Sequence, residues 1–137
     1  MRQKPNKFFP YTLILAIVAF DQSSKFLAQK DLAISCNRGF ALGISEVPLV
    51  VLLAILTLLG YFFIQEKNWI SILSFSLILG GGIANFIDRL TVGCVRDFIN
   101  FRFVPGLTWI PSFNLADVAI SVGAGILVIR LLTIRRR

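Results

Sequence analysis

Residues 47–88 read VPLVVLLAILTLLGYFFIQ, then EKN, then WISILSFSLILGGGIANFID, and this stretch decides the fold. The two apolar runs, 47–65 and 69–88, are separated only by Glu66, Lys67 and Asn68. A helix of about 20 mostly apolar residues is long enough to cross the hydrocarbon core of a bilayer. Because the connection is so short, the two runs predict an antiparallel helical hairpin inside a membrane.

Two further apolar runs flank this hairpin, Phe8–Ala28 before it and Asn114–Ile134 after it. The sequence therefore predicts an all-α integral membrane protein in which residues 1–137 form a single polytopic domain with four spans. The composition agrees, since 56% of the residues are hydrophobic and only 15% are charged. The first run has the basic flank of a signal peptide, but no small-residue cleavage site follows it, so we expect a retained helix.

The net charge of +7 could indicate a nucleic-acid-binding protein, but the basic residues do not gather on one solvated face. Many lie near the two termini, as in proteins anchored to an anionic cytoplasmic leaflet. If both termini are cytoplasmic, the inner basic residues are Arg2, Lys4, Lys7, Lys67, Arg135, Arg136 and Arg137. The outer ones are then Lys30, Arg38, Arg89, Arg96 and Arg102. This modest bias predicts membrane lipid, and no nucleic acid, as the partner.

The two outer segments, 29–46 and 89–113, are mixed in character. Apolar and polar residues alternate from Phe98 to Val104, which is typical of a short strand with one apolar face. Pro105-Gly106 then predicts a turn. We expect these segments to form a small sheet that rests on the outer leaflet.

The chain contains no histidine and only two cysteines, Cys36 and Cys94. The missing histidine excludes Ser-His-Asp and Cys-His catalysis as usually built, and also zinc held by histidine. Two cysteines without CxxC spacing are too few for a zinc site. Both fall in the outer segments, so a disulfide between them is possible, although we do not expect one.

Polar residues from distant segments are expected at one depth, the outer boundary of the membrane, when each helical residue advances 1.5 Å. They are Asp21 and Lys25 in the first span, Asn85, Asp88 and Arg89 at the end of the third, Asp97 just before the fourth, and Asn114 and Asp117 at its start. A carboxylate near hydrocarbon costs about 2.5–3.5 kcal/mol, so it is rarely present without a role. The shared depth indicates a functional site, and two carboxylates, Asp97 and Asp117, suggest acid–base chemistry.

Taken singly, these residues have ordinary structural explanations. Asp21 and Lys25 are four residues apart and could simply pair on one helix face. Asn114 and Asp117 have the N-cap to N3 spacing of a capping box. The run Gly80-Gly81-Gly82 is more typical of close helix packing than of a phosphate loop, because no Gly-Lys-Ser/Thr follows it.

Five blocks of the sequence, in order, resemble the lipoprotein signal peptidase family, the type II signal peptidases of bacteria. The blocks are Asp21-Gln22-Ser23-Ser24-Lys25, Asn37-Arg38-Gly39-Phe40-Ala41-Leu42-Gly43, Gly81-Gly82-Ile83-Ala84-Asn85-Phe86-Ile87-Asp88-Arg89, Gly93-Cys94-Val95-Arg96-Asp97-Phe98 and Phe113-Asn114-Leu115-Ala116-Asp117. Ala84 stands where the family more often has glycine, and Leu42 where it more often has phenylalanine. The chain is also short for the family.

The resemblance implies a membrane aspartic endopeptidase that removes the signal peptide from diacylglyceryl-modified prolipoproteins, cutting before the lipidated cysteine. It implies that Asp97 and Asp117 are the catalytic pair. The residues that it implies to support the site or hold substrate are Asp21, Lys25, Asn37, Gly39, Asn85, Asp88, Arg89 and Asn114. It further implies four transmembrane helices with a small β-cradle, the bacterial cytoplasmic (inner) membrane, an active site at the outer face, and neither metal nor cofactor. We expect a monomer.

Two other functions stay open on the sequence. A small four-helix transporter or channel could use Asp21 and Lys25 as an ion or proton relay. A non-catalytic membrane assembly subunit could be held together by contacts at Gly80-Gly81-Gly82 and at Gly123-x-Gly125. The ordered blocks favour the peptidase over both.

Overall fold

The computed structural model describes residues 7–31, 34–39 and 48–135. Within these residues the chain forms four helices and two short strands, in the order α1 (Phe9–Asp31), β1 (Ser35–Asn37), α2 (Leu49–Gln65), α3 (Trp69–Thr91), β2 (Val95–Asp97) and α4 (Leu115–Arg135). Each predicted span coincides with one helix. Both α1 and α3 run past the predicted ends at residues 28 and 88, because helical hydrogen bonding continues after the apolar run has stopped; Val92 N donates to Asp88 O at 2.8 Å.

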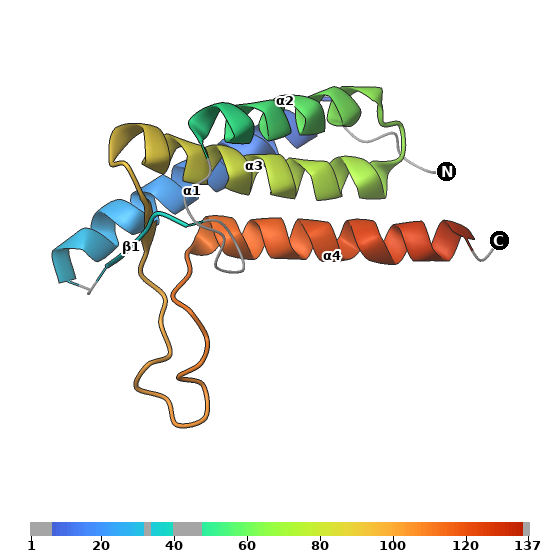
Figure 1. Ribbon diagram of the computed structural model, residues 1–137. Helices are drawn as coiled ribbons and strands as arrows, with labels where there is room; N and C mark the ends of the chain where they lie inside the picture. Colours follow the sequence, from blue (N-terminus) through green and yellow to red (C-terminus); the bar gives the residue numbers. More distant parts are fainter. Residues whose placement is uncertain (1–6, 32–33, 40–47, 136–137) are drawn as a thin grey trace.

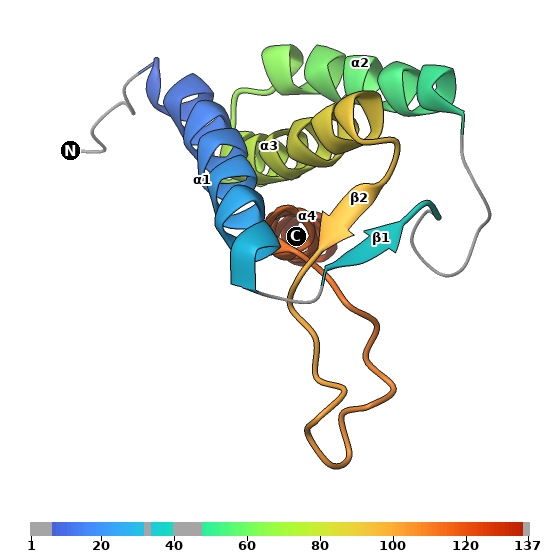
Figure 2. The same cartoon turned by 90° about the vertical axis from the view of Figure 1, so that its left-hand side faces the viewer.

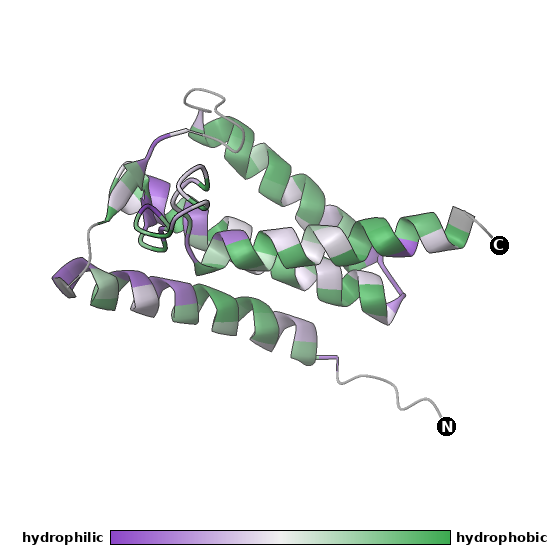
Figure 3. Ribbon diagram, turned by 90° about the horizontal axis from the view of Figure 1, so that it is seen from below, coloured by the Kyte–Doolittle hydropathy of each residue, from purple (hydrophilic) through white to green (hydrophobic). Residues whose placement is uncertain are grey.

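The helix α3 lies at the centre and packs against each of the other three helices (Figures 1 and 2). The bundle has two distinct ends (Figure 1). One carries β1, β2 and the connection from β2 to α4, and we call it the strand end. The other carries the start of α1, the connection from α2 to α3 and the end of α4, and we call it the turn end. Hydrophilic residues gather toward the strand end, whereas the helices are mostly hydrophobic (Figure 3).

Three consecutive glycines explain how α3 can approach three neighbours. A Cβ on Gly80 would lie 2.9 Å from the Ile17 side chain of α1, and one on Gly82 would lie 2.7 Å from the Leu56 side chain of α2. A Cβ on Gly81 would collide with the Ala116 carbonyl of α4. Successive helical residues point about 100° apart, so three glycines in a row serve three directions. The packing interpretation of Gly80-Gly81-Gly82 is therefore confirmed.

Two helices, α3 and the part of α4 from Leu115 to Ile134, are long and apolar enough to cross a membrane. The helix α2 is also apolar but has only 17 residues. The structure thus contains four helices, two candidate spans and a small antiparallel sheet within its described residues. The number of spans stays a prediction.

The small sheet is present, but it does not lie where the alternation predicts. The strands β1 and β2 pair antiparallel over three residues, with Ser35 opposite Asp97 and Asn37 opposite Val95. Past β2, the strand pairing among the described residues is a single isolated bridge from Ile99 to Phe113. The strand predicted from residue 98 to residue 104 is wrong, because Val104 N donates back to Phe101 O and bends the chain.

Two turns flank these elements. Leu107 N donates to Val104 O at 3.0 Å around the predicted turn at Pro105-Gly106, and Gly106 has φ +83°, so this turn is confirmed. Gly93, between α3 and β2, has φ +81°. Glycine adopts such a positive φ without the steric cost that a Cβ would bring.

A disulfide joins Cys36 in β1 to Cys94, the residue before β2, across 58 positions of sequence. This bond corrects the expectation from the sequence, which favours two unpaired cysteines. Spacing alone does not reveal it, because the two cysteines meet only when the end of α1 and the end of α3 are brought to the same side of the bundle. Their Cα atoms are 5.5 Å apart, within the usual range for a disulfide.

Candidate active site

A buried ionic cluster connects α1 to α3 at the strand end. The Lys25 ammonium lies 2.7 Å from Asp21 Oδ2 and 3.0 Å from Asp88 Oδ2, and all three side chains are fully buried. Lys25 Nζ also donates to Asn85 Oδ1 at 3.0 Å. Buried charges are tolerated only when they are paired and hydrogen-bonded, as they are here.

Asp21 has a second contact, with α4. Its Oδ1 accepts a hydrogen bond at 2.9 Å from the backbone N–H of Ala116, in the first turn of that helix. The N–H groups of a first turn lack intrahelical partners and carry partial positive charge, so a carboxylate satisfies them well. The predicted i,i+4 pair between Asp21 and Lys25 is confirmed, but Asp21 also fixes where α4 begins.

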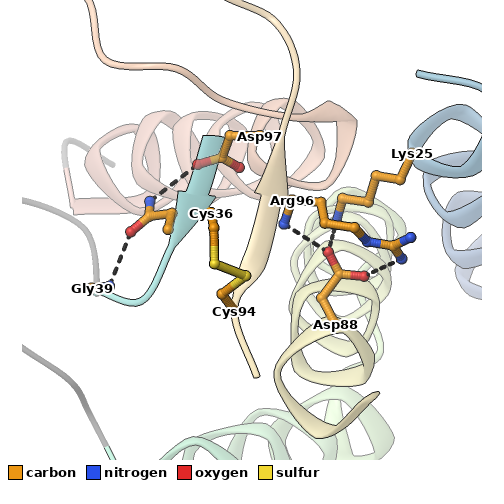
Figure 4. The surroundings of a disulfide bond; sticks show 8 residues. Lys25, Cys36, Gly39, Asp88, Cys94, Arg96 and Asp97 are labelled. Carbon is orange, nitrogen blue, oxygen red and sulfur yellow. Dashed lines mark hydrogen bonds and ion pairs between the residues drawn. A yellow bond between two sulfur atoms is a disulfide. The ribbon is translucent and has the colours of Figure 1, made fainter. Parts of the chain in front are cut away.

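The strand β2 is anchored to α3 through Asp88. Arg96 donates its backbone N–H to Asp88 Oδ2 at 2.9 Å and its Nη2 to Asp88 Oδ1 at 2.7 Å (Figure 4). The same Nη2 donates to Gln22 Oε1 at 2.8 Å, and Gln22 Nε2 donates to Asp88 Oδ1 at 2.9 Å. The residue next to Asp97 is therefore held by side chains of both α1 and α3.

Asp97, at the end of β2, is 2% exposed. Its Oδ2 accepts from Asn37 Nδ2 at 3.1 Å and its Oδ1 from Asn114 Nδ2 at 2.6 Å. Burial raises the pKa of Asp97 to about 6, and the nearby charge of Asp117 adds to this rise. The Asn37 and Asn114 amides and the Lys25 charge oppose it, because they favour the ionised form.

Asp117 is half-buried in the first turn of α4. Its Oδ2 accepts from Asn114 N at 3.1 Å, while Asp117 N donates to Asn114 Oδ1 at 3.0 Å. These reciprocal bonds are those of a capping box, as the spacing predicts. Its other oxygen, Oδ1, accepts from Asn85 Nδ2 at 2.8 Å.

Asn114 connects the two carboxylates, since one side chain contacts Asp97 and caps the turn that carries Asp117. Asn85 connects the pair to the ionic cluster, because its amide donates to Asp117 and its carbonyl accepts from Lys25. The two aspartates therefore belong to one hydrogen-bonded network. Such an arrangement can hold one carboxyl protonated beside one ionised.

Arg89 brings the first outer segment into the same network. Its Nη2 donates to Gly39 O at 3.0 Å and its Nη1 to Asn85 O at 3.4 Å. Gly39 N in turn donates to Asn37 Oδ1 at 3.0 Å. The structure thus brings together all ten residues that the sequence singles out: Asp21, Lys25, Asn37, Gly39, Asn85, Asp88, Arg89, Asp97, Asn114 and Asp117. Their individual roles stay predictions.

Comparison with known proteins decides the family. The family described as "Signal peptidase (SPase) II" matches residues 13–133, nearly the whole chain. The chain belongs to the lipoprotein signal peptidase family. Among its relatives, the lipoprotein signal peptidase of Pelodictyon phaeoclathratiforme is 33% identical, with 87% of each chain covered. That of Halothermothrix orenii is 31% identical, with 88% of this chain and 93% of the relative covered.

Solved structures agree with this assignment to the lipoprotein signal peptidase family. One, described as a bacterial membrane enzyme solved by the in meso method, superposes with a TM-score of 0.81 at 28% identity, covering 97% of this chain and 93% of the other. A second with the same description has a TM-score of 0.80 at 27% identity, covering 96% and 97%. The fold described above is therefore one already seen in bacterial membrane enzymes.

Within this lipoprotein signal peptidase fold, sequence reasoning missed two polar residues of the network, Gln22 and Arg96. Both lie inside blocks that carry the resemblance, beside Asp21 and Asp97 respectively. Neighbouring strand residues point to opposite faces, so a strand that presents Asp97 to Asn114 directs Arg96 the other way, toward α3. Correct placement of the strand would have provided the signal for Arg96.

Proposed function

We propose that this chain is a membrane aspartic endopeptidase that removes the signal peptide from diacylglyceryl-modified prolipoproteins, cutting just before the lipidated cysteine. The observation that carries the proposal is that Asn114 forms hydrogen bonds with both Asp97 and Asp117 at the strand end of an apolar bundle. Membership of the lipoprotein signal peptidase family supports the substrate class.

The proposed reaction uses the two carboxyls as an acid and a base. One carboxyl, protonated, polarises the scissile carbonyl, and the other, ionised, takes a proton from the attacking water. The proton then passes to the leaving amine as the tetrahedral intermediate collapses. The raised pKa of Asp97, about 6, favours Asp97 as the carrier of the proton.

The neighbouring amides and cations orient this pair. Asn114 and Asn85 hold one oxygen of each aspartate, which leaves the carboxyls fixed relative to one another. Lys25 sits behind Asn85 and balances the buried charges of Asp21 and Asp88. Fixed donors of this kind stabilise developing charge without having to reorganise during the reaction.

We further propose that all four helices span the bacterial cytoplasmic membrane. Large apolar side chains of α1 stay exposed, including Leu15 at 68% and Phe20 at 70%, and lipid would cover them. Charged residues make α1 less apolar overall, but Asp21 and Lys25 are fully buried and paired, so they face the bundle and not the lipid.

The disulfide and the basic residues support the proposed direction of insertion. Disulfides persist in oxidising compartments, so Cys36–Cys94 supports an extracytoplasmic strand end. Lys67, at the turn end, then lies on the cytoplasmic side, in agreement with the positive-inside rule. The carboxylate pair would face the outer boundary, where water meets the lipidated cysteine of a substrate.

A gel-shift cleavage assay tests the proposal. Purified wild-type protein in detergent is mixed with a diacylglyceryl-modified prolipoprotein, beside Asp97→Asn and Asp117→Asn. We expect the wild type to release the signal peptide and each variant to lose at least about 100-fold in rate, the lower range for acid–base catalysis. Cleavage that survives either substitution would exclude the assigned pair.

An unlipidated prolipoprotein, with its cysteine replaced by serine, is the matched substrate control. Equal cleavage of both substrates would contradict the proposed requirement for the diacylglyceryl group. If folded wild type cleaves neither substrate, the result would favour the alternative hypothesis of a small transporter or channel, in which Asp21 and Lys25 form an ion or proton relay.

A further inference from the structure

The strand β1 is the least supported element that reaches Asp97. It has three residues, none of them buried, and among the described residues it pairs only with β2. A two-stranded pair is marginally stable by itself in water. Nevertheless, β1 ends at Asn37, which supplies one of the two amide donors to Asp97.

Among the described residues, three attachments besides the strand pairing keep this segment in place. Asn37 bonds to Asp97, and Gly39 O accepts from Arg89 at 3.0 Å. The third attachment is covalent, the disulfide from Cys36 to Cys94. Cys36 immediately precedes Asn37, and Cys94 lies three residues before Asp97, so the bond joins the two segments that carry the donor and the acceptor. Figure 4 shows this bond between β1 and the start of β2, with Asp97 farther along β2.

We propose that the Cys36–Cys94 disulfide is a positioning element of the active site, which holds β1 on β2 so that Asn37 donates to Asp97. Peptidase activity therefore depends on the oxidised state of this pair. The inference rests on the proposed function. It adds that the disulfide is needed for activity, a requirement that the two catalytic carboxylates alone would not impose.

The physical argument concerns the entropy of β1. Without the cross-link, the restraints that the described residues provide are three residues of pairing and two hydrogen bonds, on a segment whose residues are half-buried or exposed. Covalent closure of the 58-residue separation removes many of the alternative positions of β1. The Asn37 amide lowers the pKa of Asp97, so its release would let that pKa rise further.

Reduction is chemically accessible, because Cys36 is exposed while Cys94 is 3% exposed. A dithiothreitol thiolate attacks Cys36 Sγ, the S–S bond breaks, and Cys94 leaves as a thiolate that takes up a proton. The second dithiothreitol thiol then displaces Cys36 from the mixed disulfide. Two electrons and two protons pass to the cysteines, and dithiothreitol ends as its cyclic disulfide.

The test compares oxidised and dithiothreitol-reduced wild type in the prolipoprotein cleavage assay across pH. We expect reduction to lower kcat by about 10- to 100-fold, the factor for loss of a hydrogen bond to a charged group. We also expect the alkaline limb of the pH–rate profile to move to higher pH. A general loosening of the fold would lower the rate without moving that limb.

Two variants serve as controls. Cys36→Ser/Cys94→Ser should resemble the reduced enzyme and be insensitive to dithiothreitol. In Asn37→Ala, reduction should lower the rate little further, since the residue through which the disulfide acts is already absent. A full additional loss on reducing Asn37→Ala would overturn the proposed route through Asn37.

Hydrogen–deuterium exchange gives a readout independent of catalysis. Reduction should speed amide exchange at residues 35–37 while leaving α3 protected. Unchanged exchange at β1, or equal rates of cleavage by the oxidised and reduced forms, would overturn the inference. If neither form cleaves, the proposed function fails, and the exchange measurement still decides whether the disulfide positions β1.

Discussion

Both ends of the bundle contain ion pairs, but those of Lys25 at the strand end are fully buried and the Arg130–Glu66 pair at the turn end is partly open to solvent. At the strand end, Lys25 is fully buried and lies 2.7 Å from Asp21 and 3.0 Å from Asp88. At the turn end, Arg130 lies 3.5 Å from Glu66, with side chains 18% and 27% exposed. Removing one member of a fully buried ion pair leaves an uncompensated charge, whereas removing one member of a pair that is partly open to solvent costs less. The difference indicates that the strand end fixes the geometry of the site.

The largest expected effect comes from removing the central cation of the strand end. Lys25→Met leaves Asp21 and Asp88 buried without their shared cation, so we expect a loss of about 3–5 kcal/mol in unfolding free energy. Chemical denaturation in detergent measures it. Lys67→Met, the same change at an exposed position of the turn end, should stay within about 0.5 kcal/mol of wild type. If the two substitutions lowered the unfolding free energy equally, the strand end would not depend on its charged residues more than the turn end does.

Packing near the strand end gives the next largest effect. Gly81→Ala places a methyl group against the Ala116 carbonyl, which belongs to the backbone and cannot rotate away. We expect a loss of about 1–3 kcal/mol in unfolding free energy, as for other overpacked sites. Gly125→Ala is the matched control, because no atom lies within 4 Å of its added Cβ. That change should raise stability by about 0.5–1 kcal/mol through helix propensity alone.

The two ends also shift their carboxylic acids in opposite directions. Burial raises the pKa of Asp97 to about 6, whereas the Asn68 N–H holds the pKa of Glu66 below its usual value. The proposed reaction needs one protonated carboxyl, and deprotonation above the raised pKa removes it. We therefore expect kcat/KM to fall about tenfold per pH unit above a limb near pH 6. A rate that stays flat from pH 6 to pH 9 would contradict a proton carried on Asp97.

The smallest effect belongs to the ion pair at the turn end. Arg130→Gln should lower unfolding free energy by less than about 1 kcal/mol, and added salt should reduce the difference. The lowered pKa of Glu66 contributes stability above its unfolded value, and this is lost as pH falls through the folded pKa. Because the Asn68 bond is the main cause, the variant should keep most of this acid sensitivity. If Arg130→Gln lowered the unfolding free energy as much as Lys25→Met, the ion pairs at the two ends would contribute equally to stability.

Local patterns predicted much of this structure correctly. The i,i+4 spacing of Asp21 and Lys25 and the capping-box spacing of Asn114 and Asp117 each became the expected contact. The apolar runs became the four helices. Such features depend on residues a turn or two apart, so the sequence carries them directly.

Features that depend on distant contacts could not be predicted in the same way. The partner of Arg96 is Asp88, eight residues away, and its contact needs the turn at Gly93. The disulfide needs β1 and β2 to pair, and the alternation pointed to residues 98–104 in place of 95–97. Three residues are too few for a period of two to be recognised.

The spacing of Asp21 and Lys25 has a consequence for biosynthesis. The first helix leaves the ribosome before α3 exists, so neither Asp88 nor Asn85 is yet available to Lys25. Because Asp21 lies one turn away on the same helix, the proposed first span carries its own counter-ion into the bilayer. The pair is electrically neutral during this proposed insertion. The same aspartate later accepts a hydrogen bond from the backbone N–H of Ala116 in the first turn of α4. Asp21 thus has two roles in succession: it neutralises Lys25 in the newly made first helix, and it accepts a hydrogen bond from α4 in the folded protein.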